Sequence, residues 1–311
     1  MSAPILSAND PAALNEAVRV LARGGLVAVP TETVYGLAAD ATNAEAVAGI
    51  YRAKGRPSAN PLIAHVDGIE MARRYGVFGS ASERLAAAFW PGPLTLVVPI
   101  ARPLTPAVHA GLATVALRHA GGTMETLVQR LGRPLAAPSA NRSGRLSPTT
   151  AAHVAASLGD RIDLVLDGGA CPGGIESTIV AFDPPRILRP GLVASREVEA
   201  SSGLAFEPGA GNAERLEAPG MMASHYAPRA LVRLDARTAR ADEAHLGFGA
   251  VAGDLNLSAS GDFAEAARNL YAFLATLDEQ HYAIAVAPVP EYGLGRAIND
   301  RLRRAAADRL R

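Results

Sequence analysis

Short apolar runs alternate with amphipathic segments through residues 1–200 of the chain. Runs rich in β-branched and other apolar residues predict strands, and apolar side chains three to four positions apart predict helices. The predicted strands are 26–29, 62–66, 94–100, 114–117, 135–138, 164–166 and 178–182, and the predicted helices are 11–23, 44–52, 81–89, 123–131 and 149–158. This alternation predicts an α/β domain with a largely covered sheet. Because proline-rich turns replace some connecting helices, we expect a twisted mixed sheet with flanking helices.

The pattern breaks between Phe206 and Arg229, where glycine, proline and small residues dominate and no period holds. Such a segment is typical of a linker. The alternation then resumes, with strands predicted near 231–234, 246–251 and 282–287 and helices near 263–277 and 294–309. We therefore expect three parts: an α/β domain (1–205), a linker (206–229) and a small Rossmann-like α/β domain (230–311).

Composition narrows the class of protein. Hydrophobic residues make up 49% of the chain, charged residues make up 19%, and the formal net charge is zero. This neutrality argues against a protein that binds nucleic acid through overall charge. A single cysteine, Cys171, excludes an internal disulfide and fits a reducing compartment. Without a recognisable signal peptide or a long apolar run, we expect a cytoplasmic protein with no membrane span.

Lys54 is the only lysine among 30 basic residues. It begins the polar stretch Lys-Gly-Arg-Pro-Ser-Ala-Asn-Pro at positions 54–61. Arginine is a planar fork, whereas the lysine ammonium is a compact point charge. The single lysine therefore indicates a tight site, such as one that holds a phosphate group. The alternative is that a lysine occupies this position by chance.

Lys54, Arg56, Ser58 and Asn60 fall at every second position of this stretch. In an extended segment these side chains would point to one side, and Pro57 and Pro61 bias their neighbours away from helix. The sequence therefore predicts a row of donors that could follow a triphosphate and its sugar. The alternative is a solvated polar loop.

A second polar segment places Ser139 and Asn141 on one side, with Ser147 following. It suits an anion or a nucleotide, although Ser-Ala-Asn also forms ordinary turns.

In a third group, Arg118 lies on a predicted strand and needs a carboxylate partner, which the substrate or an internal acidic residue could supply. His65 ends another predicted strand, where a lone histidine is most often structural.

Familiar phosphate and metal motifs are absent from the sequence. There is no Walker-type glycine-rich loop, no Gly-x-Gly-x-x-Gly fingerprint after the first strand and no metal-ligand spacing among the seven histidines. An anion-binding α/β protein without these motifs must hold phosphates with side chains.

Four ordered motifs, at 30–37, 54–62, 138–141 and 176–179, resemble those of the Sua5/YciO/YrdC family of threonylcarbamoyl-AMP synthases. The Ser-His-Tyr-Ala-Pro segment at 224–228 and the small C-terminal domain resemble the longer, two-domain Sua5 branch. The resemblance implies a nucleotidyltransferase that makes threonylcarbamoyl-adenylate and pyrophosphate from L-threonine, bicarbonate or CO2, and ATP. Another enzyme of the pathway would transfer the group to adenosine 37 of tRNA, forming t6A.

The resemblance also implies roles for individual residues. Lys54 and Arg56 are the expected catalytic residues, because charge builds on the phosphates as pyrophosphate leaves. The expected ATP-binding residues are Lys54, Arg56, Ser58, Asn60, Thr114, Ser139, Asn141, Ser147, Arg189 and Tyr226. The expected threonine-binding residues are Thr33, His65, Arg118 and Ser177, with Thr178 as an alternative to Ser177. Tyr226 is expected to close over the nucleotide, and Mg²⁺ is expected with ATP but without dedicated protein ligands.

Partners and competing functions follow from the same resemblance. The product would pass to the threonylcarbamoyl transferase complex of the t6A pathway, and a weak RNA contact is retained as a secondary expectation. One alternative is the related carbamoyl-adenylate chemistry of hydrogenase-maturation carbamoyltransferases, which the absence of zinc fingers disfavours. The other is a non-catalytic RNA-binding module, which net neutrality and 5% aromatic residues disfavour.

Overall fold

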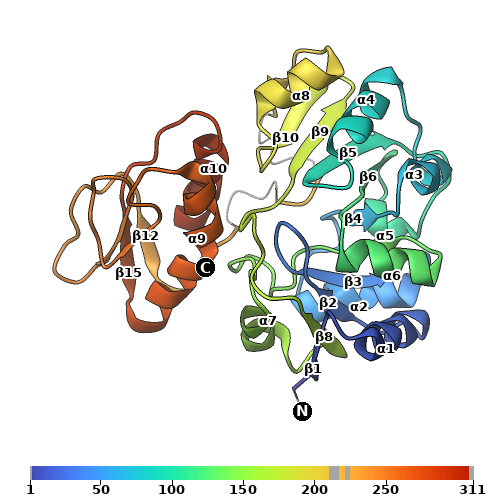
Figure 1. The fold of residues 1–311 in the computed structure, drawn as a ribbon, viewed down its shortest axis with the longest axis horizontal. Helices are drawn as coiled ribbons and strands as arrows, with labels where there is room; N and C mark the ends of the chain where they lie inside the picture. The colour runs from blue at the N-terminus through green and yellow to red at the C-terminus, as the bar shows by residue number, and fades with distance from the viewer. Residues whose placement is uncertain (1, 210–216, 221–224, 308–311) are drawn as a thin grey trace.

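The computed structural model describes residues 2–209, 217–220 and 225–307 (Figure 1). Two sheets organise these residues. The larger sheet, in the N-terminal part, has the strand order β1-β8-β2-β3-β7-β4-β6-β5-β9-β10-β11. Its strands are β1 (Ile5–Ser7), β2 (Val27–Val29), β3 (Gly36–Asp40), β4 (Ile63–His65), β5 (Leu94–Pro99), β6 (Thr114–Arg118), β7 (Leu135–Ala136), β8 (Leu164–Asp167), β9 (Thr178–Phe182), β10 (Pro185–Arg189) and β11 (Glu207–Pro208).

This sheet contains both parallel and antiparallel strand pairs. β4 pairs with β6 and β5 with β9 in parallel, whereas β2 pairs with β3 and β5 with β6 antiparallel. The predicted mixed sheet is therefore confirmed. The parallel pairing of β4 and β6 puts His65 opposite Arg118 at their carboxyl ends, so the register alone brings two predicted site residues together.

Eight helices accompany this sheet within the described residues. They are α1 (Pro11–Ala22), α2 (Ala44–Lys54), α3 (Ile69–Tyr75), α4 (Ser80–Phe89), α5 (Pro106–His109), α6 (Thr123–Leu131), α7 (Ala151–Leu158) and α8 (Ser195–Ser202). The side chain of Asn43 begins α2 by accepting hydrogen bonds from the amides of Glu45 and Ala46. Gly55 ends α2 with a φ of 62°, in the left-handed region that glycine adopts without steric cost.

This helix end corrects the predicted row of donors. Lys54 is the last residue of α2 rather than the first of an extended segment, and the amide of Asn60 donates to the carbonyl of Pro57 in a turn. The predicted alternation is wrong because the glycine cap lets the helix run two residues further than expected. Lys54, Arg56 and Asn60 are nevertheless buried, whereas Ser58 is exposed.

The C-terminal part forms the small α/β unit that the sequence predicts. Its sheet has the order β12-β15-β13-β14, and all three strand pairs are parallel. Its elements are β12 (Leu231–Arg233), β13 (Ala244–Gly247), β14 (Leu255–Asn256), α9 (Phe263–Gln280), β15 (Ala283–Val286) and α10 (Gly295–Ala306). The strand predicted at 246–251 is too long, because Phe248 and Val251 bridge to each other in a tight turn.

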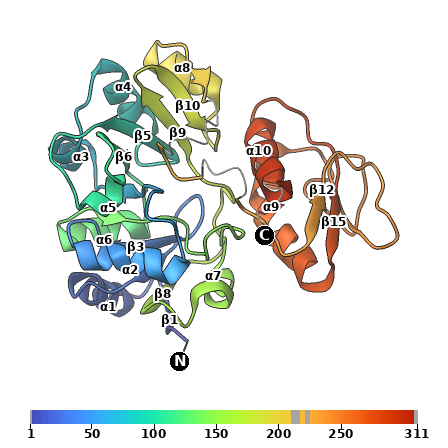
Figure 2. The ribbon, with the colours of Figure 1, turned by 180° about the vertical axis from the view of Figure 1, so that it is seen from behind.

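Both helices of the C-terminal unit lie between its sheet and the N-terminal part, as the front and back views show (Figures 1 and 2). The apolar core of this unit includes Val34 and Ile175 from the N-terminal part and Tyr226 from the predicted linker. The two parts therefore share a buried contact region rather than only a covalent connection.

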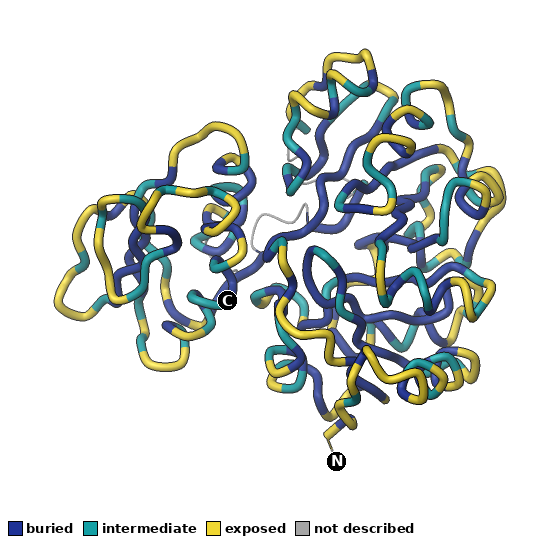
Figure 3. Tube along the Cα trace, in the orientation of Figure 1, coloured by how far each residue is buried: buried dark blue, intermediate teal, exposed yellow. Residues whose placement is uncertain are grey.

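Buried residues dominate the central strands of the large sheet, whereas the edge strands β1 and β11 are mostly exposed (Figure 3). The predicted linker also contributes to this core, since Phe206 is buried there and β11 pairs with β10. Residues 210–216 and 221–224 of that linker, and positions 308 and 309 of the last predicted helix, lie outside the described residues. The division at 205 and 229 stays a prediction.

Candidate functional site

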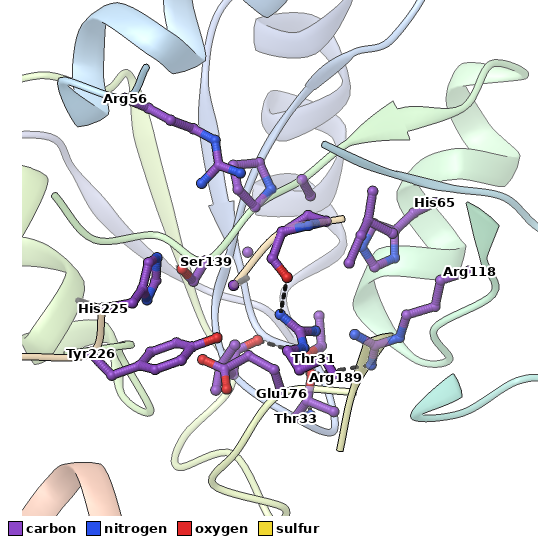
Figure 4. Close-up of a pocket in the computed structure, with 17 residues that line it drawn as sticks. Thr31, Thr33, Arg56, His65, Arg118, Ser139, Glu176, Arg189, His225 and Tyr226 are labelled. Carbon is purple, nitrogen blue, oxygen red and sulfur yellow. Dashed lines mark hydrogen bonds between the residues drawn. The ribbon is translucent and has the colours of Figure 1, made fainter. Parts of the chain in front are cut away.

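A small cavity lies where the ends of several strands meet the linker, and we call it the central cavity (Figure 4). Its volume is about 40 Å³. Among the described residues, its wall consists of Thr31, Thr33, Val34, Gly36, Arg56, Ile63, His65, Arg118, Ala137, Pro138, Ser139, Glu176, Arg189, Pro219, Gly220, His225 and Tyr226. Seven of the predicted site residues are in this set: Thr33, Arg56, His65, Arg118, Ser139, Arg189 and Tyr226.

Arginine dominates the charge of the central cavity. Arg56, Arg118 and Arg189 are each buried, and Glu176 is the one carboxylate among the described residues of the wall. Burial lowers the pKa of Arg56 to about 10, partly offset by Tyr51 and Tyr226, so its guanidinium stays charged at neutral pH. Even with Arg118 paired to Glu32, the buried cations of the wall outnumber the neighbouring carboxylates, a charge balance that favours anionic ligands.

Arg118 stands at the end of β6 with three partners. Its guanidinium donates to the carboxylate of Glu32, to the hydroxyl of Thr33 at 3.1 Å and to the carbonyl of Gly92 at 3.2 Å. The predicted need for a carboxylate partner is thus met internally by Glu32. The three contacts fix the plane of the guanidinium, which turns one edge toward the central cavity beside His65 (Figure 4).

His65 is buried at the end of β4. Burial, together with the charge of Arg118, holds the pKa of its imidazole well below the usual range, so the ring is neutral at physiological pH. Its Nδ1 atom has no hydrogen-bond partner among the residues that the structure describes. A neutral imidazole with a spare nitrogen can exchange a hydrogen bond with a polar ligand in the cavity.

Lys54 lies behind the cavity wall. Its Nζ atom donates to the carbonyl oxygen of Ser139 at 2.6 Å and to that of Asn141 at 2.5 Å. Burial, and secondarily Arg56, holds the pKa of this ammonium well below its usual value. In the structure the lysine therefore joins the end of α2 to the 138–141 segment, and direct contact with a phosphate stays a prediction.

Several other predicted residues do not line the central cavity. Ser58 is exposed, and Thr114 is half-buried at the start of β6. Asn60 and Asn141 are buried, and the side-chain amide of Asn141 donates to the carbonyls of Arg142 and Arg145. These side chains shape the neighbouring loops, and their contacts with a nucleotide stay predictions.

Ser147 and Ser177 occupy a layer directly behind the wall. Ser147 donates to Glu176, while Ser177 accepts a hydrogen bond from Arg189 at 3.1 Å. The hydroxyl of Thr178, the alternative to Ser177, donates to the carbonyl of Val193. These contacts make the segment at 176–178 a support for Arg189.

Sequence analysis missed Glu176, Thr31 and His225 as cavity residues. Each stands beside a residue that was singled out, and Glu176 belongs to a recognised motif. Burial lowers the pKa of His225 to about 3 with help from Arg56, so this imidazole is neutral too. Their position next to, or two residues from, predicted site residues in short polar motifs was the available signal.

Tyr226 closes the central cavity from the linker side. It is 1% exposed, and its φ of 59° is unusual for a residue with a side chain. Its hydroxyl has no hydrogen-bond partner among the described residues, although the oxygen is buried at the cavity wall. Because the hydroxyl has no partner, the packing of the ring rather than a hydrogen bond holds this strained conformation.

Two family models match the chain. The model of the Sua5/YciO/YrdC family, described as "Telomere recombination", matches residues 19–191, and a second, described as "Threonylcarbamoyl-AMP synthase, C-terminal domain", matches residues 192–307. The chain belongs to the Sua5/YciO/YrdC family. The resemblance of the four motifs is thereby confirmed.

Relatives from distant organisms cover almost the whole chain. The threonylcarbamoyl-AMP synthase of Bacillus subtilis is 39% identical over 98% of this chain and 96% of its own. That of Pyrococcus abyssi is 38% identical over 92% of each chain. Members of the family with these names make an adenylate, which is a nucleotidyltransferase reaction.

Solved structures of the family agree with the fold. The crystal structure of P. abyssi Sua5 complexed with L-threonine has a TM-score of 0.90 at 35% identity and covers 97% of both chains. Escherichia coli YciO, at 18% identity and a TM-score of 0.54, covers 61% of this chain and shares the fold alone. The two-part architecture, with its C-terminal α/β unit, is therefore that of the Sua5 branch.

Proposed function

We propose that the central cavity is the active site of a threonylcarbamoyl-AMP synthase. The observation that supports this proposal is the convergence of three buried arginines, Arg56, Arg118 and Arg189, on the wall of a single cavity. L-threonine offers one carboxylate, and ATP offers three phosphates. The full-length similarity to synthases of two organisms supports the same conclusion.

The reaction requires two bond-forming steps. The amine of threonine attacks the carbon of CO2 derived from bicarbonate and loses a proton, which gives a carbamate. A carbamate oxygen then attacks the α-phosphorus of ATP, and the bond to the β-phosphate breaks to release pyrophosphate. Negative charge develops on the carbamate in the first step and on the departing pyrophosphate in the second. Cations held in position can therefore accelerate adenylate formation without a covalent nucleophile.

We propose individual roles, which the positions of the side chains support. Arg118 and Thr33 hold the carboxylate of threonine, with His65 beside them. Arg56 and Arg189 face the phosphates. Lys54 holds the 138–141 segment and so places Ser139 on the nucleotide.

The central cavity is smaller than a nucleotide site, since ligand pockets usually measure about 300–1,000 Å³. His225 and Tyr226 form the part of its wall contributed by the linker. We therefore propose that ATP enters only when this wall moves outward, and that Tyr226 returns over the bound nucleotide. The expected lid role of Tyr226 is retained in this form.

Magnesium is proposed to arrive with ATP. No three histidine, cysteine, aspartate or glutamate side chains come together as a metal site among the described residues. The one carboxylate of the wall, Glu176, already accepts hydrogen bonds from Ser147 and Tyr271 and pairs with Arg301. The side chains present do not fit a dedicated magnesium site, so its ligands would be phosphate oxygens and water.

We further propose that the product serves a threonylcarbamoyl transferase complex that modifies adenosine 37 of tRNA, and that the enzyme acts in the cytoplasm. No described helix has the length and apolar character to cross a membrane. Weak RNA contact remains a secondary proposal.

Purified protein with ATP, bicarbonate and labelled threonine tests the function. We expect pyrophosphate release that depends on threonine, together with a labelled adenylate detected by mass spectrometry. Reactions without threonine or without bicarbonate are the controls. Absence of threonine-dependent release would overturn the proposal, and salt-sensitive RNA binding without turnover would favour the binding module.

A further inference from the structure

Arg301 of α10 crosses from the C-terminal unit to the wall of the central cavity. Its side chain is 1% exposed, and its Nε lies 3.0 Å from the Glu176 carboxylate. Its Nη1 donates to the carbonyl of Pro190 and lies 3.1 Å from Asp300. Arg301 is far in sequence from the four family motifs, and it nevertheless forms a hydrogen-bonded ion pair with Glu176 of the cavity wall.

Both oxygens of Glu176 are bound from two sides. Tyr271 of α9 donates to them, at 3.2 Å from Oε1 and 3.0 Å from Oε2, and Ser147 of the N-terminal part donates to Oε1. Two of the three partners, Arg301 and Tyr271, thus come from the C-terminal unit. The orientation of this carboxylate depends on how that unit docks.

The electrostatics of the site require this pairing. Burial would raise the pKa of the Glu176 carboxyl, but Arg301, Arg189 and the hydroxyl of Ser147 bring it down to about 2. Removing one partner of a buried ion pair leaves a desolvated charge and is strongly unfavourable. A carboxylate held ionised in this way is a poor general base at neutral pH, which assigns Glu176 to support rather than proton transfer.

Arg301 also contacts the linker. The carbon at the centre of its guanidinium lies 5.5 Å from the centroid of the Tyr226 ring, within the range of a cation–π interaction. The Tyr226 ring packs against that of Tyr271 with centroids 5.8 Å apart. The same two residues of the C-terminal unit therefore hold both a carboxylate and an aromatic ring of the cavity wall.

We propose that Arg301, assisted by Tyr271, is a positioning residue for adenylate formation, and that the C-terminal unit completes the nucleotide side of the active site. Arg301 acts through Glu176 and Tyr226 and touches neither substrate. This inference rests on the proposed function. It gives the C-terminal unit a part in catalysis rather than a role only in shielding or in docking another protein.

Kinetics of full-length variants test this inference. We expect Arg301→Met to raise the KM for ATP by about tenfold or more, while the dissociation constant for threonine, measured by calorimetry, changes less than about twofold. Tyr271→Phe removes one hydroxyl at nearly constant volume and should shift the KM for ATP in the same direction by less. Arg303→Met is the matched control, since Arg303 lies on the same helix with a side chain that is 57% exposed, and should leave both constants unchanged.

A double variant separates positioning from stability. Glu176→Gln combined with Arg301→Met removes both charges of the Glu176–Arg301 pair, so its free energy of unfolding should recover toward that of the wild type relative to Arg301→Met. Its KM for ATP should stay raised, because the contact with Tyr226 is still missing. Recovery of both quantities together, or an unchanged KM in Arg301→Met, would reduce Arg301 to a purely structural residue and overturn the inference.

A binding measurement keeps this test independent of the proposed function. Calorimetry with a non-hydrolysable ATP analogue requires no threonine chemistry. Weaker analogue binding in Arg301→Met than in Arg303→Met would support the inference even if the wild type released no pyrophosphate. Equal binding in an active enzyme would refute the inference and leave the synthase function intact.

Discussion

The ammonium of Lys54 donates a hydrogen bond of 2.5 Å to the carbonyl oxygen of Asn141, 87 positions further along the chain. A second bond, to Ser139, makes this ammonium a bridge between α2 and the turn after β7. Two of the family motifs are therefore joined by the one lysine of the sequence. A compact, rotatable donor suits two converging carbonyls, whereas a planar fork does not.

Replacing Lys54 with arginine should abolish most activity although the charge is kept. We expect adenylate formation to fall by about 100-fold or more, since the bulkier guanidinium displaces the 138–141 segment from the buried site. Initial rates of pyrophosphate release measure the effect. Arg52→Lys on the same helix is the control, because Arg52 is exposed and pairs with Glu45 at the surface. Near-normal rates in the Lys54 variant would mean that this position tolerates any cation.

Arg118 should determine the affinity for threonine more than that for ATP. In Arg118→Lys one ammonium replaces a guanidinium that binds Glu32, Thr33 and Gly92 together, so the donor facing the cavity is lost or misplaced. We expect the KM for threonine to rise by about 10- to 100-fold and that for ATP by less than about threefold. Arg130→Lys, at an exposed position of α6, serves as the control. An equal rise of both constants would contradict the assignment of Arg118 to threonine.

The fold was predictable where side chains carried the signal. β9 matches the predicted strand because Thr-Ile-Val-Ala-Phe is β-branched and apolar. β3 was missed because Gly-Leu-Ala-Ala-Asp has no strand propensity, and only burial between β2 and β7 makes it a strand. Small, alanine-rich strands of this kind are defined by tertiary pairing, which no local pattern encodes.

The site was predictable by residue type but not by geometry. Residue chemistry and motif order selected Arg56, Arg118 and Arg189, all of which line the central cavity. The assumption of an extended segment failed at Gly55, whose left-handed cap turns the chain after Lys54. The role of Arg301 could not be predicted from the sequence. Its ion pair with Glu176 depends on how the C-terminal unit docks on the N-terminal part, and the local sequence pattern of each part does not determine that docking.

Acid should destabilise the protein in two stages. Burial holds the pKa of His225 at about 3, below the ordinary value of 6.5, so between these values the unfolded chain binds a proton that the folded chain does not. The free energy of unfolding therefore decreases as the pH falls from about 6.5 toward 3. Glu176, with its pKa lowered from 4.5 to about 2 by its cationic neighbours despite burial, adds a further loss below about pH 4.5.

Denaturant unfolding between about pH 7.5 and 4 measures the first stage. In His225→Asn the decrease below about pH 6.5 should become shallower but not vanish, since burial of His65 acts in the same direction. His281→Asn, on a less buried histidine, should keep the wild-type slope. Identical slopes in both variants would show that protonation of His225 is not linked to folding.

Gly174 lies directly against α9 of the C-terminal unit. With a φ of 73° it faces α9, and a Cβ at this position would overlap the carbonyl oxygen of Ala267 and the Cα of Arg268. Gly169 in the same region has a φ of 80°, but a Cβ there would meet no atom within 4 Å. An alanine at either position would have the same strained left-handed backbone. Only at position 174 would its Cβ also overlap the C-terminal unit.

Comparing Gly174→Ala with Gly169→Ala measures how much the contact with α9 contributes to stability and to the KM for ATP. Gly169→Ala should lose about 1–2 kcal/mol of unfolding free energy from backbone strain alone. Gly174→Ala should lose more, because α9 must move away, and it should also raise the KM for ATP as Tyr271 and Arg301 withdraw from Glu176. Equilibrium unfolding and steady-state kinetics on the two variants provide the comparison. Equal effects would mean that the docking of α9 against residues 173–175 does not support the active site.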